Sequence, residues 1–346
     1  MHKSVTIHDI AKAVNVSSAT VSRVLSNSDY PVSSELKMKI QQAAKDMAYV
    51  PNMLGKQLKT KQSRMIGVIV PTITNPFYSS VMLGIEEVAR KNDFQVMLCN
   101  TLQDSKVENE YVKTIFEKQI KGLIISSISP DQNTLSDYIK LGLKVIAIDQ
   151  QIDLDHVRQV GFDYRKGGYL ATRHLLKKGH TKIAYVTAPL DRPSRKSVYE
   201  GYMDALREAG IERNPEWVRV EGEMNDYSGI SEYENGRRLT CELLALADRP
   251  TAIFACNDMT AFGVINELAN QSVRVPEEMS VIGFDDIEFS RMVTPALTTV
   301  RQPDYEMGKL ACSMLFDILD GEKEQEMGIM LQPKLIERQS VAAPPD

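Results

Sequence analysis

The apolar positions of the chain follow two different patterns, which change near residue 64. Before that point, apolar residues recur at helical spacing in residues 7–14, 17–25 and 33–47, and a Ser or Thr stands at the start of each segment. Such residues are good helix N-caps. The pattern predicts three short helices, and the tight turn at Asn15 joins the first two as a helix-turn-helix.

From residue 66 onward, short β-branched runs alternate with amphipathic segments. This alternation indicates parallel strands buried on both faces and separated by helices. The pattern runs through twice, which predicts two α/β lobes with a ligand cleft beyond the carboxyl ends of their strands. The expected strands are residues 66–70, 94–98, 122–126, 144–148, 157–162, 182–187, 217–220, 251–256 and 280–284, and the expected helices are residues 78–91, 106–118, 132–141, 166–178, 198–209, 234–247 and 259–270.

The charge of the 346-residue chain is distributed unevenly, although its net value is only −5. Residues 1–64 carry 10 Lys and Arg against 4 Asp and Glu, a net charge of +6, whereas the remainder has a net charge of −11. A basic head on an acidic body is an asymmetry that points to nucleic acid.

The second predicted helix has residues suited to reading DNA. Ala19 can meet a thymine methyl group, and Arg23 can bind guanine O6 and N7 together. Ser17 and Thr20 can donate hydrogen bonds to phosphates near the positive end of the helix. The alternative interpretation is a plain helical hairpin whose polar face is only solvated.

The segment after Pro51 is too short to form a stable isolated helix, and Gly55 weakens it by about 1 kcal/mol relative to Ala. It is either a flexible linker or a hinge that orders only on DNA. In the second case Leu58 inserts as an apolar wedge between base steps.

The sequence shows no catalytic or cofactor fingerprint. It contains no GxGxxG after a strand, no phosphate-binding P-loop and no GxSxG. We therefore expect no cofactor and no metal site, and we expect His174 and His180 to be surface residues. The adjacent carboxylates Asp285 and Asp286 follow a strand, where they can bind a ligand hydroxyl, cap a helix, or do both.

Three features of the sequence predict a cytoplasmic protein. The first ten residues lack the apolar core of a signal peptide, and no apolar stretch is long enough to span a membrane. The four cysteines are far apart in the sequence, as expected of free thiols in a reducing compartment. A solute-binding receptor without DNA binding and an α/β enzyme remain alternatives at this point.

Several motifs occur in the order typical of one family. They are residues 6–11 (TIHDIA), 19–25 (ATVSRVL), 49–52 (YVPN), 66–71 (IGVIVP), 75–78 (NPFY), 281–286 (VIGFDD), 295–303 (PALTTVRQP) and 335–338 (LIER). From residue 6 to residue 338 they span nearly the whole chain, which resembles the lactose/galactose repressor (LacI/GalR) family. The resemblance implies an all-α helix-turn-helix head, a hinge helix, and an α/β core of two doubly wound parallel-sheet lobes of the periplasmic-binding-protein type.

The resemblance also implies a function. Members bind pseudo-palindromic operator DNA as homodimers, and a small effector, typically a sugar or sugar derivative, changes their operator affinity by altering the angle between the lobes. We therefore expect a transcriptional repressor. The absence of a leucine heptad after Leu335 favours a dimer over a tetramer. The expected boundaries are 1–50 for the head, 51–62 for the hinge and linker, and 63–346 for the core, with an N-lobe of about 63–161 plus 292–320 and a C-lobe of about 162–291 plus 321–346.

Carried over by position, the resemblance assigns two groups of site residues. The expected DNA contacts are Ser17, Ser18, Ala19, Thr20, Ser22, Arg23, Tyr49, Asn52 and Leu58, and we add the basic Lys56 as an expected phosphate contact. The expected effector contacts are Phe77, Tyr78, Asp149, Gln150, Asp163, Arg192, Ser194, Met224, Asn257 and Asp285. Val198 stands where many sugar-binding members carry an Arg that holds sugar hydroxyls. The basic loop at Arg192, Arg195 and Lys196 is either a solvated surface or a contact for an acidic or phosphorylated effector.

Overall fold

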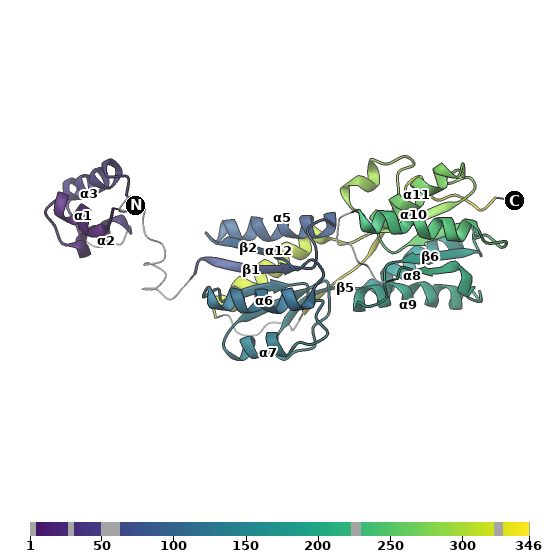
Figure 1. Cartoon of the computed structure of the whole chain (residues 1–346), viewed down its shortest axis with the longest axis horizontal. Helices are drawn as coiled ribbons and strands as arrows, with labels where there is room; N and C mark the ends of the chain where they lie inside the picture. Colours follow the sequence, from purple (N-terminus) through teal and green to yellow (C-terminus); the bar gives the residue numbers. More distant parts are fainter. Residues whose placement is uncertain (1–4, 27–30, 50–62, 223–229, 322–327, 346) are drawn as a thin grey trace. The chain divides into compact units, whose positions relative to one another are not determined.

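The computed structural model describes residues 5–26, 31–49, 63–222, 230–321 and 328–345. The chain divides into two compact units, Met1–Gln62 and Ser63–Asp346 (Figure 1). Each unit has its own hydrophobic core. We call them the head and the core.

The head contains the three helices predicted from its apolar spacing. Thr6 caps the first helix reciprocally with Asp9, because the Thr6 N–H donates to Asp9 Oδ2 at 2.8 Å and the Asp9 N–H donates to Thr6 Oγ1 at 3.3 Å. Asn15 lies in the turn with a φ of 54°, a conformation that Asn tolerates well. The helices are α1 (Ile7–Ala13), α2 (Ser18–Leu25) and α3 (Ser34–Asp46), and they pack around the buried side chains Ile10, Ala11, Val21, Val24, Ile40 and Ala44.

The first lobe of the core, the N-lobe, is built on a parallel sheet in the order β11-β5-β4-β3-β1-β2. Its strands are β1 (Met65–Val70), β2 (Gln95–Asn100), β3 (Gly122–Ile125), β4 (Lys144–Ile148), β5 (Arg158–Phe162) and β11 (Gly328–Leu331). Its helices are α5 (Pro76–Lys91), α6 (Ser105–Glu117), α7 (Asn133–Lys140) and α12 (Asp304–Leu319).

Helices α5 and α12 of the N-lobe pack closely because each carries a glycine that lies against the backbone of the other helix. A Cβ atom on Gly84 would lie 2.1 Å from the carbonyl oxygen of Tyr305, and one on Gly308 would lie 2.0 Å from that of Val81. Both distances are far below van der Waals contact, so a larger residue at either position would force the helices apart.

The second lobe, the C-lobe, has a sheet in the order β12-β10-β9-β8-β6-β7, in which only β12 runs antiparallel to its neighbour. Its strands are β6 (Ile183–Thr187), β7 (Val218–Val220), β8 (Ala252–Ala255), β9 (Ser280–Asp285), β10 (Thr298–Arg301) and β12 (Lys334–Ile336). Its helices are α8 (Tyr164–Lys177), α9 (Pro193–Glu208), α10 (Ser231–Leu244) and α11 (Asp258–Asn270), with short 3-10 turns η1 (Pro215–Trp217) and η2 (Glu288–Arg291). The predicted class, a helical head and two parallel-sheet lobes, is confirmed.

The chain crosses between the lobes three times, and the predicted lobe boundaries need correction. Strand β10 pairs with β9, so residues 298–301 belong to the C-lobe and not to the N-lobe as expected. Strand β11 pairs with β5, so residues 328–331 belong to the N-lobe and not to the C-lobe. The crossings therefore lie between β5 and α8, between β10 and α12, and between β11 and β12 (Figure 1).

The three crossings lie against one another. The Tyr164 hydroxyl of the first crossing lies 3.2 Å from Gln302 Oε1 of the second. The Asp163 N–H donates to the carbonyl of Leu331 at 3.1 Å, which joins the first crossing to the third. The lobes are thus connected by one bundle of three segments.

Two histidines expected at the surface are buried. The His180 ring is hydrogen-bonded to Thr251 Oγ1 at 2.9 Å and to Ser280 Oγ at 3.0 Å, and His174 is 7% exposed. The expectation failed because the C-terminal segment covers this end of α8: the His180 ring also lies 2.9 Å from the carbonyl of Ala342. Within the described ranges, no cluster of His, Cys, Asp or Glu is arranged to hold a metal ion. No helix of the described chain has the length and apolar character needed to cross a bilayer.

Candidate DNA-contact and effector sites

Helix α2 presents a polar face away from the core of the head. Val21 and Val24 point into that core and are buried, whereas Ala19 and Arg23 are exposed. The N-cap Ser17 accepts a hydrogen bond from the Thr20 N–H at 3.1 Å. The start of the helix is therefore stabilised by Ser17, and its exposed first turn is available to an approaching duplex.

Ser18 and Tyr49, two further expected DNA contacts, are held by the rest of the head. His8 Nδ1 lies 3.2 Å from Ser18 Oγ, which connects α1 to the start of α2. Tyr49 packs against the core of the head, and its N–H donates to the carbonyl of Ala44 at 2.8 Å. Of the remaining expected contacts, Thr20 and Ser22 are half-buried, and Asn52, Lys56 and Leu58 lie outside the described residues.

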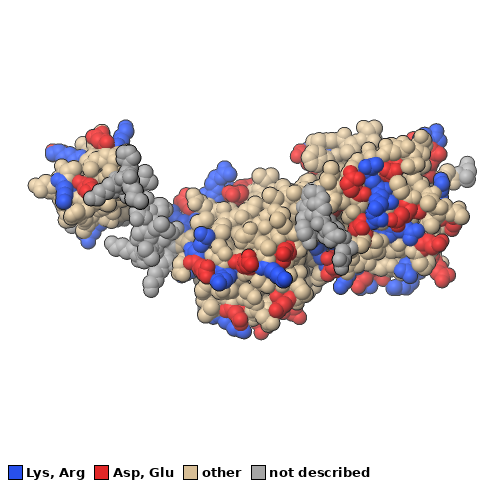
Figure 2. Space-filling view, viewed as in Figure 1, with Lys and Arg blue, Asp and Glu red and all other residues tan. Residues whose placement is uncertain are grey.

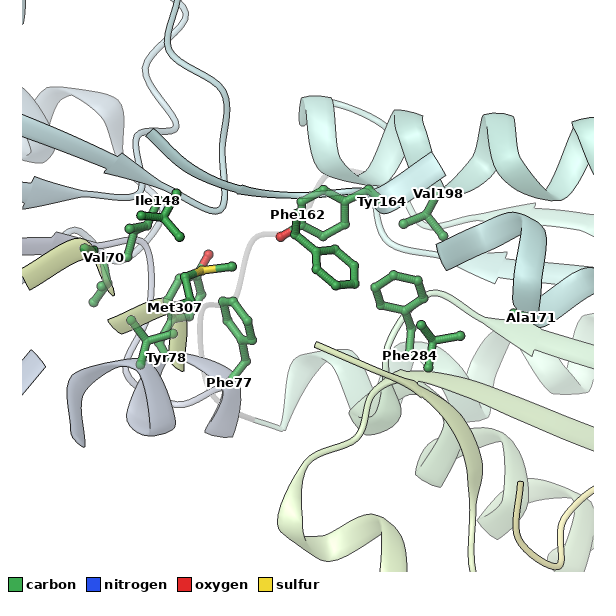
Figure 3. Close-up of a cluster of buried hydrophobic side chains, with 14 of the residues drawn as sticks. Val70, Phe77, Tyr78, Ile148, Phe162, Tyr164, Ala171, Val198, Phe284 and Met307 are labelled. Carbon is green, nitrogen blue, oxygen red and sulfur yellow. The ribbon is translucent and has the colours of Figure 1, made fainter. Parts of the chain in front are cut away.

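A cavity of about 630 Å³, its open mouth included, lies where the carboxyl ends of both sheets meet. This is the place where doubly wound sheets bind ligands. The N-lobe supplies Thr72, Asn75, Phe77, Tyr78, Gln103, Asp149 and Gln150; the crossings supply Tyr164 and Gln302; and the C-lobe supplies Arg192, Ser194, Arg195, Val198, Glu232, Cys256, Asn257, Phe284 and Asp285. Figure 3 shows the aromatic part of this lining, with Phe77 and Tyr78 from α5 and with Tyr164 and Phe284 near the crossings.

Eight of the ten expected effector residues line this cavity: Phe77, Tyr78, Asp149, Gln150, Arg192, Ser194, Asn257 and Asp285. Asp163 does not line it, because its carboxylate caps α8 and accepts a hydrogen bond from the Lys166 N–H at 3.0 Å. The next residue, Tyr164, lines the cavity instead. Met224 lies outside the described residues.

Asp149 is the centre of a buried hydrogen-bond network. It follows β4 with a φ of 61°, in the left-handed region. Its Oδ2 atom accepts hydrogen bonds from Tyr78 at 2.7 Å, from Ser126 at 2.9 Å and from Gln150 at 2.9 Å, and its Oδ1 atom accepts one from Tyr164. Burial, followed by the charge of Asp149, raises the pKa values of both tyrosines well above the usual value. The tyrosines therefore stay protonated and act as donors.

Asp285 ends β9 with a φ of 119°, a backbone conformation that non-glycine residues rarely adopt. Its Oδ1 atom accepts a hydrogen bond from Gln302 at 2.7 Å. Burial, followed by the charges of Asp258 and Glu232, raises the pKa of Asp285 well above the ordinary carboxyl value. The network Asp149–Tyr164–Gln302–Asp285 thus runs across the cavity from one lobe to the other.

Asp286, the next residue, faces a different set of partners. Its carboxylate forms ion pairs with Arg301 and Arg338, each at 2.6 Å, and its side chain is almost fully buried. These three residues also line a second hollow, together with Leu83 of α5 and Phe289 of η2. The two adjacent aspartates that the sequence singled out therefore serve two different places in the molecule.

Polar contacts also cross the mouth of the cavity directly. Arg192 Nη2 donates to Gln103 Oε1 at 2.5 Å, and Gln150 Nε2 donates to Ser194 Oγ at 2.8 Å. Gln103, Glu232 and Gln302 were not among the expected site residues. Only Gln302 lay in a recognised motif, at residues 295–303, and no local pattern marked Gln103 or Glu232.

A helical DNA-contact head joined to a two-lobed core with a cleft cavity defines the class of ligand-responsive DNA-binding regulators. Residues 6–52 match the model of bacterial regulatory proteins of the lacI family, and residues 172–341 match the periplasmic binding protein-like domain. The chain belongs to the lacI family of bacterial regulatory proteins, and it is a transcription regulator and not an enzyme.

Individual relatives agree with this membership. The chain is 32% identical to the transcriptional repressor PurR of Aliivibrio salmonicida, with 97% of this chain and 98% of the relative covered. A ribose-bound LacI-family regulator from Enterococcus faecium is 32% identical, with a TM-score of 0.72 over 81% of this chain and 99% of that one. The lac repressor dimer bound to operator is 26% identical, with a TM-score of 0.86 over 99% of this chain and 100% of that one.

Proposed function

We propose that the chain is a repressor that binds a pseudo-palindromic operator as a homodimer. A small molecule in the cavity, a sugar or sugar derivative, controls its affinity for that operator. The observation that carries the proposal is that both lobes and their crossings line one cavity. A ligand that touches both lobes binds one inter-lobe angle more tightly than another and shifts the population toward it.

In this proposal, α2 reads the bases in the major groove. Arg23 binds a guanine, Ala19 meets a thymine methyl, and Ser18 approaches the base edges beside them. Ser17, Thr20, Ser22, Tyr49 and Asn52 bind the phosphate backbone, together with Lys56, while Leu58 inserts into the minor groove. The charge asymmetry supports this division, because residues 1–64 have a net charge of +6 and the remainder has one of −11. Figure 2 shows acidic and basic side chains interspersed over the visible face of the core.

Dimerisation is supported by an apolar surface near the second hollow. Leu83 of α5 is 65% exposed and Phe289 of η2 is 51% exposed, and both line that hollow. Exposed apolar side chains grouped around a depression are typical of protein interfaces. The related lac repressor was solved as a dimer bound to its operator.

A carbohydrate ligand is supported by the chemistry of the cavity. Carboxylates and amides that can bind hydroxyl groups stand beside the aromatic rings of Phe77, Tyr78 and Phe284, on which the apolar face of a sugar ring can pack. The related regulator from Enterococcus faecium was crystallised with ribose. A repressor of this kind works in the cytoplasm and is bound to the nucleoid while it occupies its operator.

The test is operator binding by the full chain, measured by fluorescence anisotropy on a duplex selected from a random pool. Titrations are run without effector and with a saturating sugar found by thermal-shift screening. We expect the two titrations to differ several-fold in dissociation constant. Identical curves at saturating effector would refute control by the ligand, and failure to select any duplex would refute sequence-specific binding.

A further inference from the structure

Two arginines stand at the start of α9 in the cavity, and they differ in their partners. Arg195, whose side chain is 13% exposed, lies 3.1 Å from Asp191 and 4.0 Å from Glu232. Arg192 instead donates to the neutral amide oxygen of Gln103. Within the described part of the chain, no carboxylate lies within ion-pair distance of the Arg192 guanidinium. The cavity therefore contains a positive charge with no direct counter-charge.

The carboxylates of the cavity are engaged elsewhere. Asp149 accepts four hydrogen bonds, and Asp285 accepts one from Gln302. Asp149 and Asp191 are near enough to raise the pKa of Arg192, but burial and the charge of Arg195 outweigh them and lower it. An anion placed beside Arg192 would replace the water lost on burial and offset the repulsion between the two arginines.

One of the helices that begin at the cavity reinforces this preference. The start of α9 has no side-chain cap and no Asp or Glu in its first turn. The start of α8, by contrast, is capped by the Asp163 carboxylate, and α10 and α11 carry acidic residues in their first turns. The uncompensated positive end of α9 therefore favours a negative group beside it.

We propose that the effector is an anionic monosaccharide derivative, a sugar acid or a sugar phosphate, whose charged group binds the guanidinium of Arg192. This inference rests on the proposed function and names the chemical class of its ligand. The polar side chains Gln150 and Asn257, which also line the cavity, bind the hydroxyl groups. Val198 is buried near Phe284 and adds no second cation at that wall (Figure 3).

The experiment is isothermal titration calorimetry of the full chain with matched ligands. One series is ribose, ribonate and ribose 5-phosphate, and the other is glucose, gluconate, glucuronate and glucose 6-phosphate. We expect an anionic member to bind about ten- to hundred-fold more tightly than its neutral partner, the range for one hydrogen bond to a charged group. Whether acids or phosphates bind best identifies the anionic group. Equal or tighter binding of the neutral sugar, or binding of no anionic member, overturns the proposal.

Two variants separate the charge of Arg192 from its role in closing the cleft. Arg192→Gln should abolish the preference for the anion while retaining the affinity for the neutral sugar. Gln103→Ala removes the hydrogen bond to Arg192 but keeps the guanidinium, so it should retain the preference. Arg165→Gln, which removes an ion pair between α8 and Asp204 of α9, is the distant control. An Arg192→Gln chain that weakens neutral and anionic ligands equally overturns the proposal.

The outcome is separable from that of the proposed function, because calorimetry needs no DNA. An anionic ligand that binds Arg192 but leaves operator binding unchanged would refute ligand control and uphold the charge preference. A neutral sugar that binds most tightly and shifts operator binding would uphold ligand control and refute the charge preference. Fluorescence of the single tryptophan, Trp217, verifies that each variant is folded.

Discussion

The substitution Tyr164→Phe tests the hydrogen-bonded connection between the lobes. It removes one hydroxyl group and leaves the aromatic ring, which packs at 5.0 Å from Phe162 between ring centroids. That hydroxyl donates to Asp149 Oδ1 and lies 3.2 Å from Gln302 Oε1. No other hydrogen bond to Asp149 Oδ1 is present in the described chain, so the substitution leaves that buried oxygen unsatisfied.

The magnitude follows from the charge of the acceptor. A hydrogen bond to a charged group contributes about 1.5–3 kcal/mol, and three donors to the other oxygen of Asp149 remain. We therefore expect the free energy of unfolding of the core to fall by about 2 kcal/mol. Urea denaturation followed by Trp217 fluorescence measures it, because this tryptophan is buried in the C-lobe.

Tyr169→Phe is the matched control. The Tyr169 hydroxyl also donates to a carboxylate, that of Glu208, but on the exposed surface of α8. Its loss should leave the denaturation midpoint unchanged, because water replaces the donor. If Tyr164→Phe destabilises the core no more than Tyr169→Phe does, the connection between the crossings does not contribute to stability and our reasoning is wrong.

Three further predictions concern the head and the pH dependence of the core. Arg23→Ala should weaken binding to the selected operator by about 1–3 kcal/mol and leave random duplex binding nearly unchanged, as measured by anisotropy; an equal loss on both duplexes would remove Arg23 from the base readers. Ser17→Ala should destabilise the head by about 1 kcal/mol, visible as a lower melting temperature of the head by circular dichroism, because α2 loses its N-cap; an unchanged melting temperature would contradict the capping role. Burial raises the pKa of Asp258 from 3.8 to about 7. Between these two values the unfolded chain has lost the proton that the folded chain still holds, so the free energy of unfolding should fall as the pH rises from about 4 to 7. Urea denaturation at pH 5 and at pH 8 measures this loss of stability, and the loss should be smaller in Asp258→Asn. An equal loss in both chains would count against a raised pKa of Asp258.

Local patterns in the sequence predicted the elements well where each element's own residues decide its structure. The three head helices begin after Thr6, Ser17 and Ser33 as their capping chemistry predicts. The start of α9 was predicted five residues too late, because Pro193 was not recognised as its first residue. Proline is tolerated there because an N–H group at the first position of a helix has no carbonyl partner within the helix, so none is lost when proline lacks it.

Features that depend on distant partners were not predictable in the same way. Strand β11 was assigned to the wrong lobe because it is placed by pairing with β5, more than a hundred residues away, and not by its own composition. Strand β10 pairs with β9, the strand directly before it in the chain, so there the expected crossing came too early in the sequence. The cavity residues Gln103 and Glu232 come from segments with no distinctive pattern. Asp163 was expected in the cavity, but its role as the cap of α8 left that place to Tyr164.

The three crossings also bear on how such a protein acquires a new ligand. Most of the side chains that line the cavity stand at strand ends or in the first two turns of α5, α9 and α10, whereas Tyr164 and Gln302 stand on the crossing segments. In the proposed function, the movement between the lobes depends on these crossing segments. A replacement such as Val at position 198 changes the lining of the cavity and leaves the crossing segments intact. Ligand choice and signal transmission can therefore evolve separately, and an engineered change of effector should begin at positions such as 198 and spare Tyr164 and Gln302.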